Sequence, residues 1–408
     1  CYCFEIKRSD IDATIIARAA HPDMANMLET RPHYFAKTAV FLSSTDLACM
    51  SAQIAAIERV VKTPVYQDAV LARDSGALHH IQAQTSGAFM GYDFHVTQDG
   101  PRLIEINSNA GGAFIVNALE QAIGKPHPDF GKDIATMFIS EWQQSGRTGR
   151  PKTIAIIDEN PPAQFHYPDM LLAQKTLETQ GFTVVILDPA ALAFDGHQLM
   201  YTPATGKAHI VDLVYNRLTD FTLRAPQNAA LRHALKANAV VVTPSPRHHG
   251  LYADKRNLVW LSDDETLTNW GVPEDIRAPL SRIPKTIEVT PENAEDLWCQ
   301  RRKYFFKPNA GFGSRGTYRG AKLTKRVWAH IQQGGYIAQA FIAPPVRAVT
   351  RAHDQTELKF DVRVYTYEGK TLLLAARVYQ GQTTNLRTDG GGLAPIVTLD
   401  AEVKNITC

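Results

Sequence analysis

The stretch that decides the fold runs from Tyr304 to Gly320 and reads YFFKPNAGFGSRGTYRG. Its aromatic start predicts a buried strand that ends near Lys307, and residues 317–319 return to strand-type side chains after a glycine-rich segment. Glycine lets main-chain N–H groups converge on an anion without a Cβ in the way. Lys307 adds a mobile positive charge at the end of the strand. The stretch therefore predicts a strand–loop–strand flap over phosphate groups.

Two other interpretations of this stretch stay open. Gly311, Gly313 and Gly316 also satisfy the spacing G-x-G-x-x-G, which in dinucleotide-binding enzymes requires a helix to begin at the loop. A strand-like segment follows here, and the acid expected about 20 residues later is missing. An NAD(P)-dependent oxidoreductase is therefore the less favoured alternative. The third interpretation is a glycine-rich hairpin whose lysine and arginine are only solvated.

Length and composition fit a globular protein with several lobes. The chain has 408 residues, of which 44% are hydrophobic and 21% charged. A net charge of +2 gives no reason to expect a nucleic-acid or membrane partner. No apolar run could span a bilayer, and no signal-peptide pattern opens the chain. The five cysteines are scattered without zinc-ligand spacing, so we expect reduced thiols and a cytoplasmic location.

A polar hairpin is predicted between residues 90 and 107, with its turn at Asp99-Gly100. Asp93 lies on the first strand, and the alternation of side chains puts Glu105 and Asn107 on one face of the second. Two carboxylates and an amide oxygen form a ligand set suited to magnesium. Acids on an exposed strand face would explain the same residues without a metal. The small residues 108–112 that follow offer free N–H groups.

The middle of the chain predicts an α/β unit. A Gly/Arg/Pro linker at residues 146–151 precedes strands at 153–157, 183–187, 211–215 and 240–243, with helices at 170–180 and 227–237. A polar hairpin is expected at 199–202 and 208–211. Strands that alternate with helices predict a parallel sheet whose ligands bind at the carboxyl ends of the strands. Glu159 and Arg217 lie at such ends, where Arg217 could hold a carboxylate or be a surface arginine.

The remaining segments receive simpler assignments. Residues 10–90 are expected to be mainly helical, and Asp254 is expected to cap a helix that starts there. Residues 273–284 look like a loop. Three further strands are expected at 335–342, 359–365 and 372–378, followed by a polar, glycine-rich loop at 383–392.

Taken together, these segments resemble the ATP-grasp superfamily of carboxylate–amine ligases. In that family a nucleotide lies between two α+β lobes under a glycine-rich flap. Here the metal-binding hairpin comes first in the chain, which is similar to the circularly permuted glutathione synthetase type found in eukaryotes. The likeness runs from about residue 85 onward and rests on segments in the same order as in that type: 99–112, Phe306-Lys307-Pro308, Tyr336-Ile337 and 386–392.

The resemblance implies a fold of the α/β and α+β classes: a circularly permuted ATP-grasp fold with an inserted parallel-sheet α/β substrate-binding domain and an N-terminal helical region. Residues 1–150 would form the helical region and the metal-binding half of the core. Residues 151–250 would form the substrate-binding domain. Residues 251–408 would form the nucleotide-binding lobe, with the flap and the rest of the core.

The resemblance also implies roles for individual residues, with ATP and Mg²⁺ as cofactors. Magnesium would be held by Asp93, Glu105 and Asn107. ATP would contact Lys255, Lys307, Gly311, Gly313, Ser314 and Gly316, with Gln339 and Phe341 near the adenine. Reaction-centre residues would be Arg363, Asn385 and Arg387. Substrates would contact Ser108, Asn109, Glu159, Arg217 and Gly391.

The implied activity is ATP-dependent formation of an amide from a small carboxylate and an amine, such as an amino acid or small peptide, through an acyl phosphate. A homodimer is also implied. Two departures from the family leave the substrates open. The flap reads Asn309-Ala310-Gly311 where the family usually carries an acidic metal ligand, and Asp389 replaces a lysine in the last loop. The missing flap acid also favours an alternative, a non-catalytic ATP-binding module.

Overall fold

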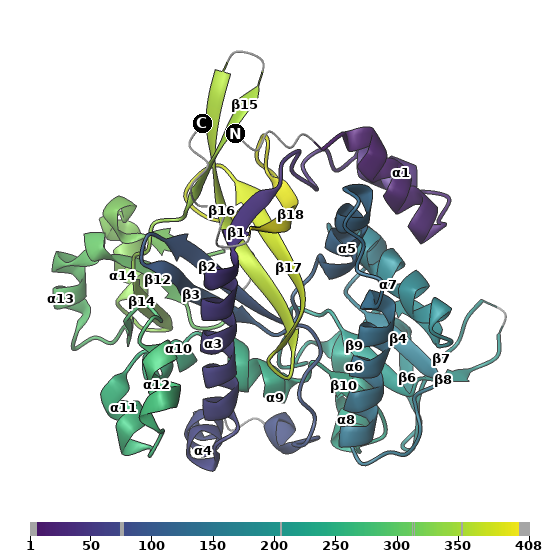
Figure 1. Cartoon of the computed structure of the whole chain (residues 1–408). Coiled ribbons are helices and arrows are strands. Elements are labelled where there is room, and N and C mark those ends of the chain that lie inside the picture. The colour runs from purple at the N-terminus through teal and green to yellow at the C-terminus, as the bar shows by residue number, and fades with distance from the viewer. Residues whose placement is uncertain are drawn as a thin grey trace.

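The computed structural model describes residues 6–73, 77–204, 206–311, 313, 315–351 and 354–399. A seven-stranded sheet at its centre combines strands from both ends of the chain (Figure 1). Its order is β1-β18-β17-β16-β2-β3, and β15 pairs with β16 outside this path. The strands are β1 (Val40–Ser43), β2 (Met90–Thr97), β3 (Gly100–Asn107), β15 (Val346–Arg351), β16 (Asp354–Tyr367), β17 (Lys370–Tyr379) and β18 (Gly392–Leu399).

The polar hairpin expected from the sequence is confirmed as β2 and β3, which pair antiparallel. β16 pairs antiparallel with both β2 and β17, so that Arg363 lies opposite Asp93 and Arg377 lies opposite Asp361. Residues about 270 positions apart in the sequence thereby become cross-strand neighbours, the closest relation that a sheet offers. This pairing builds one polar surface from two distant segments.

One face of the central sheet is apolar and is covered by α3 (Ser44–Val61) (Figure 1). Tyr92, Val362 and Val378 belong to the same buried cluster as Ile54 and Ile57 of α3. These sheet residues have even numbers, and alternation along a strand sends the odd-numbered residues to the other face. The helix that buries the apolar face therefore fixes which side chains point the opposite way.

The parallel α/β unit is confirmed. It contains β10 (Val241–Thr243), β9 (Leu213–Asn216), β4 (Thr153–Ile157) and β5 (Thr183–Leu187), adjacent in that order and all parallel. Ile154 and Ile156 of β4 pack into a core shared with α6 (Phe130–Gln144) and α7 (Tyr167–Thr179). Ala155 and Ile157 pack on the other face with α8 (Ala229–Lys236). The expected polar hairpin appears as β7 (Leu199–Tyr201) and β8 (His209–Ile210), with β6 (Leu192–Phe194) beside β7.

The flap is built as strand–loop–strand. A third sheet has the order β11 (Thr286–Glu288), β14 (Tyr336–Ala340), β12 (Tyr304–Pro308) and β13 (Tyr318–Arg319). β12 and β13 pair antiparallel, with Phe306 opposite Tyr318. Among the described residues between β12 and β13 none is α-helical, whereas a dinucleotide fingerprint needs a helix there. The interpretation of these glycines as a dinucleotide fingerprint, on which the oxidoreductase alternative depended, is therefore wrong.

Short helices complete the fold: α1 (Arg8–Ala19), α2 (Met24–Glu29), α4 (Pro64–Ala72), α5 (Ala113–Ala122), α9 (Pro246–His248), α10 (Asn257–Leu261), α11 (Asp264–Asn269), α12 (Glu274–Leu280), α13 (Ala294–Cys299) and α14 (Lys325–Ile331). Two sequence assignments are corrected here. Residues 273–284 were expected to form a loop but contain α12. Pro273 precedes the first turn of this helix, and Pro279 lies in its last turn. Asp254 caps no helix; α10 begins after Arg256, and the Asp254 carboxylate accepts hydrogen bonds from Arg256. None of the helices in the described ranges is long and apolar enough to cross a membrane.

Candidate functional site

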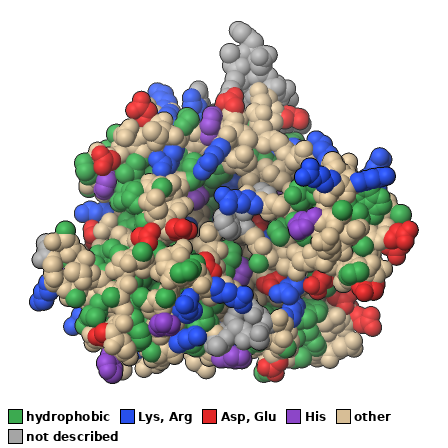
Figure 2. All heavy atoms as spheres, turned by 180° about the vertical axis from the view of Figure 1, so that it is seen from behind, with side chains coloured by type: hydrophobic (Ala, Val, Ile, Leu, Met, Phe, Trp, Pro, Cys, Tyr) green, Lys and Arg blue, Asp and Glu red, His purple; other side chains and the backbone are tan. Residues whose placement is uncertain are grey.

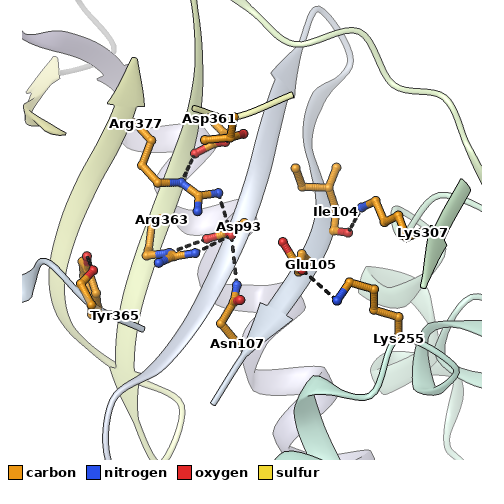
Figure 3. Close-up of polar contacts among 12 residues, drawn as sticks. Asp93, Ile104, Glu105, Asn107, Lys255, Lys307, Asp361, Arg363, Tyr365 and Arg377 are labelled. Carbon is orange, nitrogen blue, oxygen red and sulfur yellow. Dashed lines mark hydrogen bonds and ion pairs between the residues drawn. The ribbon is translucent and has the colours of Figure 1, made fainter. Parts of the chain in front are cut away.

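The polar face of the central sheet carries a network of buried ions centred on Asp93 (Figure 3). Arg363 donates from Nε to Asp93 Oδ1 at 2.6 Å and from Nη2 to Oδ2 at 2.7 Å. Arg377 Nη2 and Asn107 Nδ2 also donate to Oδ2, at 2.7 Å and 3.0 Å. Asp93 is fully buried, and these hydrogen-bond donors offset the free-energy cost of burying its charge.

Arg377 connects Asp93 to a second buried acid. Its Nε donates to Asp361 Oδ1 at 2.6 Å, while Thr384 donates its hydroxyl to Asp361 Oδ2 at 2.6 Å. Thr384 lies in the glycine-rich loop after β17, so the network reaches from the hairpin to that loop. The two acids raise the pKa of Arg377 despite its burial, which opposes this rise. This alternation of signs fixes both arginines in place.

Glu105 lies next to this network and faces the flap. Lys255 Nζ is 3.0 Å from Glu105 Oε1 and also donates to the carbonyl oxygen of Gly311 at 3.0 Å. The Glu105 side chain is 24% exposed, and that of Lys255 is 7% exposed. One lysine thus joins the hairpin carboxylate to the backbone of the flap.

Lys307 approaches the same point from the end of β12. Its Nζ donates to the carbonyl oxygen of Ile104 at 2.8 Å and to Gln339 Oε1 at 2.9 Å. The acidic hairpin and the strand that leads into the flap therefore lie side by side, because Lys307 bonds to the residue before Glu105 (Figure 3).

The pKa values of this cluster are shifted by burial and by charge. Burial lowers the pKa of Lys307 to about 8, although Glu105 opposes the shift. Burial would raise the pKa of Glu105, but Lys255 and Lys307 outweigh it and lower that pKa. Glu105 is therefore ionised at neutral pH, and Lys307 can lose its proton under mildly alkaline conditions.

The flap glycines adopt the conformations for which glycine was expected. Gly313 has φ +60° and Gly316 has φ +67°, the left-handed region that other residues rarely enter. A Cβ on Gly311 would lie 2.9 Å from Pro308 Cγ. Ser314, expected to contact ATP, lies outside the described residues.

The two residues expected near adenine lie beside the flap. Gln339 is buried on β14 and accepts from Lys307. The ring of Phe341 stacks on Phe305, with centroids 6.4 Å apart, and Arg319 lies 4.5 Å over it. Phe341 follows β14 of the flap sheet, and its contact with adenine stays a prediction.

Arg217 reaches the turn after β3 from the end of β9. Its Nη1 donates to the carbonyl oxygen of Asn109 at 2.8 Å, and a Cβ on Gly111 would lie only 2.5 Å from its Nη2. Arg217 is 7% exposed, yet its Nε has no hydrogen-bond partner. Ser108 contacts His249, with Oγ and Nδ1 3.4 Å apart. The alternative of a surface arginine is wrong, because Arg217 is buried.

Glu159 and its neighbour Asp158 differ in burial. Glu159, expected to contact substrate, has an exposed side chain. Asp158 is 8% exposed, and burial raises its pKa to about 6 although Arg217 opposes the rise. Asp158 is therefore one of the acids near Arg217, together with Asp169, whereas the predicted contact of Glu159 with substrate stays a prediction.

His166 was missed altogether by sequence analysis. Burial lowers its pKa to about 3, and the charges of Arg217 and Arg363 lower it further, with Arg31 and Arg387 adding to the effect. His166 is therefore neutral, and four arginines lie close enough to it to lower its pKa. No local pattern marks His166, since its importance comes from side chains on four other segments.

The last loop holds its predicted residues near the surface. Asn385 and Arg387 are exposed; Asn385 Oδ1 accepts from the backbone N of Arg387 at 2.9 Å. The Arg387 guanidinium lies 4.8 Å over the ring of Phe165, beside His166. Gly391 is required by packing, because a Cβ there would lie 2.7 Å from Thr388 Oγ1.

Some of the side-chain oxygens expected to bind magnesium already accept hydrogen bonds from other side chains. Among the described residues, no three His, Cys, Asp or Glu side chains are grouped to hold a metal ion. Both oxygens of Asp93 accept from arginines, whereas the Asn107 amide donates through Nδ2 and leaves its oxygen for a cation. Glu105 and Asn107 thus form a small set of hard oxygen ligands, which fits Mg²⁺ held mainly by phosphate and water.

Comparison with known proteins places the fold. No protein-family model matches the chain, and no curated protein matches it in sequence. The chain shares the overall fold of a glutathione synthetase-like protein, which is the type of fold that the sequence predicted. This likeness is to the structure of a glutathione synthetase-like effector, GSS30, from Globodera pallida. The two structures match with a TM-score of 0.52 and 10% sequence identity, over 98% of this chain and 100% of the other. A protein from Methylobacillus flagellatus assigned as a gamma-glutamylcysteine synthetase matches with a TM-score of 0.42, 14% identity and coverage of 82% and 84%.

Proposed function

We propose that this protein is an ATP-dependent carboxylate–amine ligase that uses Mg²⁺. The observation that carries the proposal is the convergence of Lys255, Lys307 and Glu105 between the flap and the hairpin. Two buried lysines beneath a glycine-rich flap suit the phosphates of a nucleotide. A carboxylate beside them suits the cation that accompanies those phosphates.

In the first step, a carboxylate oxygen of the substrate attacks the γ-phosphorus of ATP, and the bond to the β–γ bridging oxygen breaks to release ADP. Lys255 and Lys307 stabilise the charge on the transferring oxygens. Mg²⁺, when bound through Glu105 and Asn107, supplies further charge neutralisation. The arginines around His166, including Arg217 and Arg363, hold the anionic substrate in line for this attack.

In the second step, the amine nitrogen attacks the acyl carbon of the acyl phosphate. The tetrahedral intermediate collapses and expels inorganic phosphate, while the nitrogen loses a proton to phosphate or water. No enzyme nucleophile takes part. Arg363 and Arg377 are held rigidly by Asp93 and Asp361, and such fixed charges need little reorganisation as the negative charge moves.

The test is ADP formation from MgATP with a panel of carboxylates and hydroxylamine, which traps an acyl phosphate as a hydroxamate. We expect Lys307→Ala and Glu105→Ala to lower turnover roughly a hundred- to a thousandfold. Arg59→Gln is the matched control, since Arg59 forms only an exposed pair with Asp275. Near-normal turnover in either site variant, with an unchanged circular dichroism spectrum, would count against the proposal.

A second candidate is a non-catalytic ATP-binding module. It is favoured by Asn309, Ala310 and Gly311 at the start of the flap, where no acid is available to complete a metal site. Such a protein would bind MgATP at the same lysines without releasing ADP with any carboxylate. Calorimetric binding without turnover across the panel would support this second candidate over the ligase.

We also propose three functional units: residues 1–150, 151–250 and 251–408, carrying the metal-binding half, the substrate-binding domain and the nucleotide lobe. The circular permutation, the cytoplasmic location and the homodimer stay predictions. Gel filtration with light scattering would test the homodimer, for which we expect about twice the chain mass of 45.2 kDa.

A further inference from the structure

A pocket of about 340 Å³ is lined by residues that do not belong to the ion network around Asp93. Its walls come from the end of α4, the loop after β9, the turn before α10 and the first flap residues; they include Arg73, Phe221, His249, Asp254 and Gly311. This volume lies within the range of pockets that hold small molecules. On the side of the molecule away from α3, Lys and Arg side chains border a central hollow (Figure 2).

The pocket adjoins the candidate reaction centre through two shared contacts. His249 forms part of its wall and also contacts Ser108, the residue after Asn107. Gly311 lines the pocket while its carbonyl oxygen accepts from Lys255. A molecule in this pocket would therefore lie beside the flap and the hairpin without displacing the lysines proposed for ATP.

Arg73 contributes a positive charge to the wall of this pocket. Its guanidinium carbon lies 3.3 Å from the centroid of the Trp260 ring, and this stacking holds the guanidinium plane fixed. Its Nη1 is buried and has no hydrogen-bond partner among the described residues. Burial lowers the pKa of Arg73 to about 10, although Asp254 opposes the shift. At neutral pH the guanidinium is still charged.

The acids of the pocket are already engaged. Asp254 accepts from Arg256 through both oxygens, at 3.0 Å from Nε to Oδ1 and 2.5 Å from Nη2 to Oδ2. Asp220 accepts from the backbone N of Ala225 at 2.7 Å and from Asn228 Nδ2 at 2.8 Å. The hydrogen bonds of these two acids go to other groups, and Arg73 contributes a positive charge to the pocket wall.

We propose that this pocket binds the acceptor amine of the ligase, and that Arg73 pairs with an anionic group on that acceptor. The inference rests on the proposed function and specifies its second substrate as an amino acid or small peptide with a free carboxylate. A planar guanidinium fixed by stacking suits the two oxygens of a carboxylate. A phosphate group would satisfy the same donors, so the experiment includes both anions.

The activity arm first uses hydroxylamine, which has no anionic group, to find a carboxylate that the wild-type protein activates. With that carboxylate, acceptors are compared in pairs that differ in the anionic group: glycine with glycinamide, and glycylglycine with its amide. Aminomethylphosphonate tests a phosphate-like group. Variants are Arg73→Gln, Arg73→Lys and the surface control Arg59→Gln.

We expect Arg73→Gln to raise the KM for the carboxylate-bearing acceptors about tenfold or more, with partial rescue in Arg73→Lys. Hydroxamate formation and the KM for ATP should stay within about twofold of wild type, which also shows that the variant is folded. Equal use of glycine and glycinamide by the wild-type protein, or an unchanged KM in Arg73→Gln, would overturn the proposal. Preference for the phosphonate would replace carboxylate by phosphate as the group bound.

A binding experiment tests the anion site at Arg73 independently of activity. It remains informative if no hydroxamate forms, although the absence of hydroxamate would refute the proposed function. Trp260 touches Arg73, so glycylglycine or inorganic phosphate bound there should change tryptophan fluorescence. We expect a saturable change in the wild-type protein that is lost in Arg73→Gln and in Trp260→Phe. A response that persists in Arg73→Gln, or none at millimolar concentrations, would refute an anion site at Arg73.

Discussion

Glu105 and Lys255 form an ion pair, with Oε1 and Nζ 3.0 Å apart. A nucleotide phosphate and its cation would have to replace this pair, because each partner is needed by the ligand. We expect Lys255→Met to free Glu105, so that Mn²⁺ alone binds severalfold more tightly than to the wild-type protein, while ATP binds more weakly. Electron paramagnetic resonance titration of Mn²⁺ measures the first effect, with Lys285→Met as a surface control because its side chain is 56% exposed. Weaker Mn²⁺ binding to Lys255→Met would contradict this role for the pair.

Lys307 should make ATP binding depend on pH. Its pKa is lowered to about 8 in the folded protein, so its charged fraction falls as pH rises through that value. We expect the Kd for ATP to rise about tenfold between pH 7.5 and 9, because the charged form binds phosphate. Lys307→Met should bind weakly at both values with no such change. An equal Kd for wild type at the two pH values would show that Lys307 stays charged or does not contact ATP.

The same shift has a consequence for stability. The pKa of Lys307 is lower in the folded protein than in the unfolded chain. Burying its charge therefore lowers the free energy of unfolding, and this penalty is complete below about pH 8. This penalty is relieved as pH rises from about 8 toward the unfolded pKa. Relative to Lys307→Met, the wild-type protein should therefore gain unfolding free energy over this window.

At the scale of elements, Asp93 connects β2 to β16 and β17. Removing it would leave Arg363 and Arg377 as buried charges without their shared partner. We expect Asp93→Ala to lower the free energy of unfolding by about 3 to 5 kcal/mol, measured by urea denaturation. Asp275→Ala breaks an exposed pair with Arg59 and should change it by less than about 1 kcal/mol. Stability of Asp93→Ala equal to wild type would mean that Asp93 contributes to a ligand site and not to the fold.

The elements that sequence predicted well are those with strong local signals. The Asp99-Gly100 turn with alternating flanks marked the β2–β3 hairpin, and the aromatic run before Lys307 marked β12. α12 was missed because Pro273 and Pro279 suggested a loop, although proline is tolerated before the first turn of a helix. Local patterns therefore located strands and turns but misread a short helix bounded by prolines.

The role of Asp93 could not be read from its neighbours in the sequence. Its position suggested a metal ligand, yet its partners Arg363 and Arg377 lie about 270 and 284 residues away. His166 and Asp158 depend in the same way on arginines from other segments. Residue types at strand ends predict where a site lies, but which side chains pair within it is decided by tertiary contacts.

At the scale of the whole molecule, the central sheet brings the two ends of the chain to one site. β2 and β3 supply the acids, β16 and β17 the arginines, and the flap sheet supplies Lys307. The parallel α/β unit adds Arg217 at the end of β9, where open α/β sheets usually bind ligands. In the proposed function, a nucleotide binds at the flap, an anionic substrate at the arginines and an acceptor at Arg73.

A crystal structure with a non-hydrolysable ATP analogue and Mn²⁺ tests the central claim most directly, because anomalous scattering locates the cation without ambiguity. We predict Mn²⁺ bound to a Glu105 oxygen, with the analogue's terminal phosphates in contact with the amino groups of Lys255 and Lys307. A nucleotide bound elsewhere, or Mn²⁺ remote from Glu105 while the Lys255–Glu105 pair stays intact, would contradict the account.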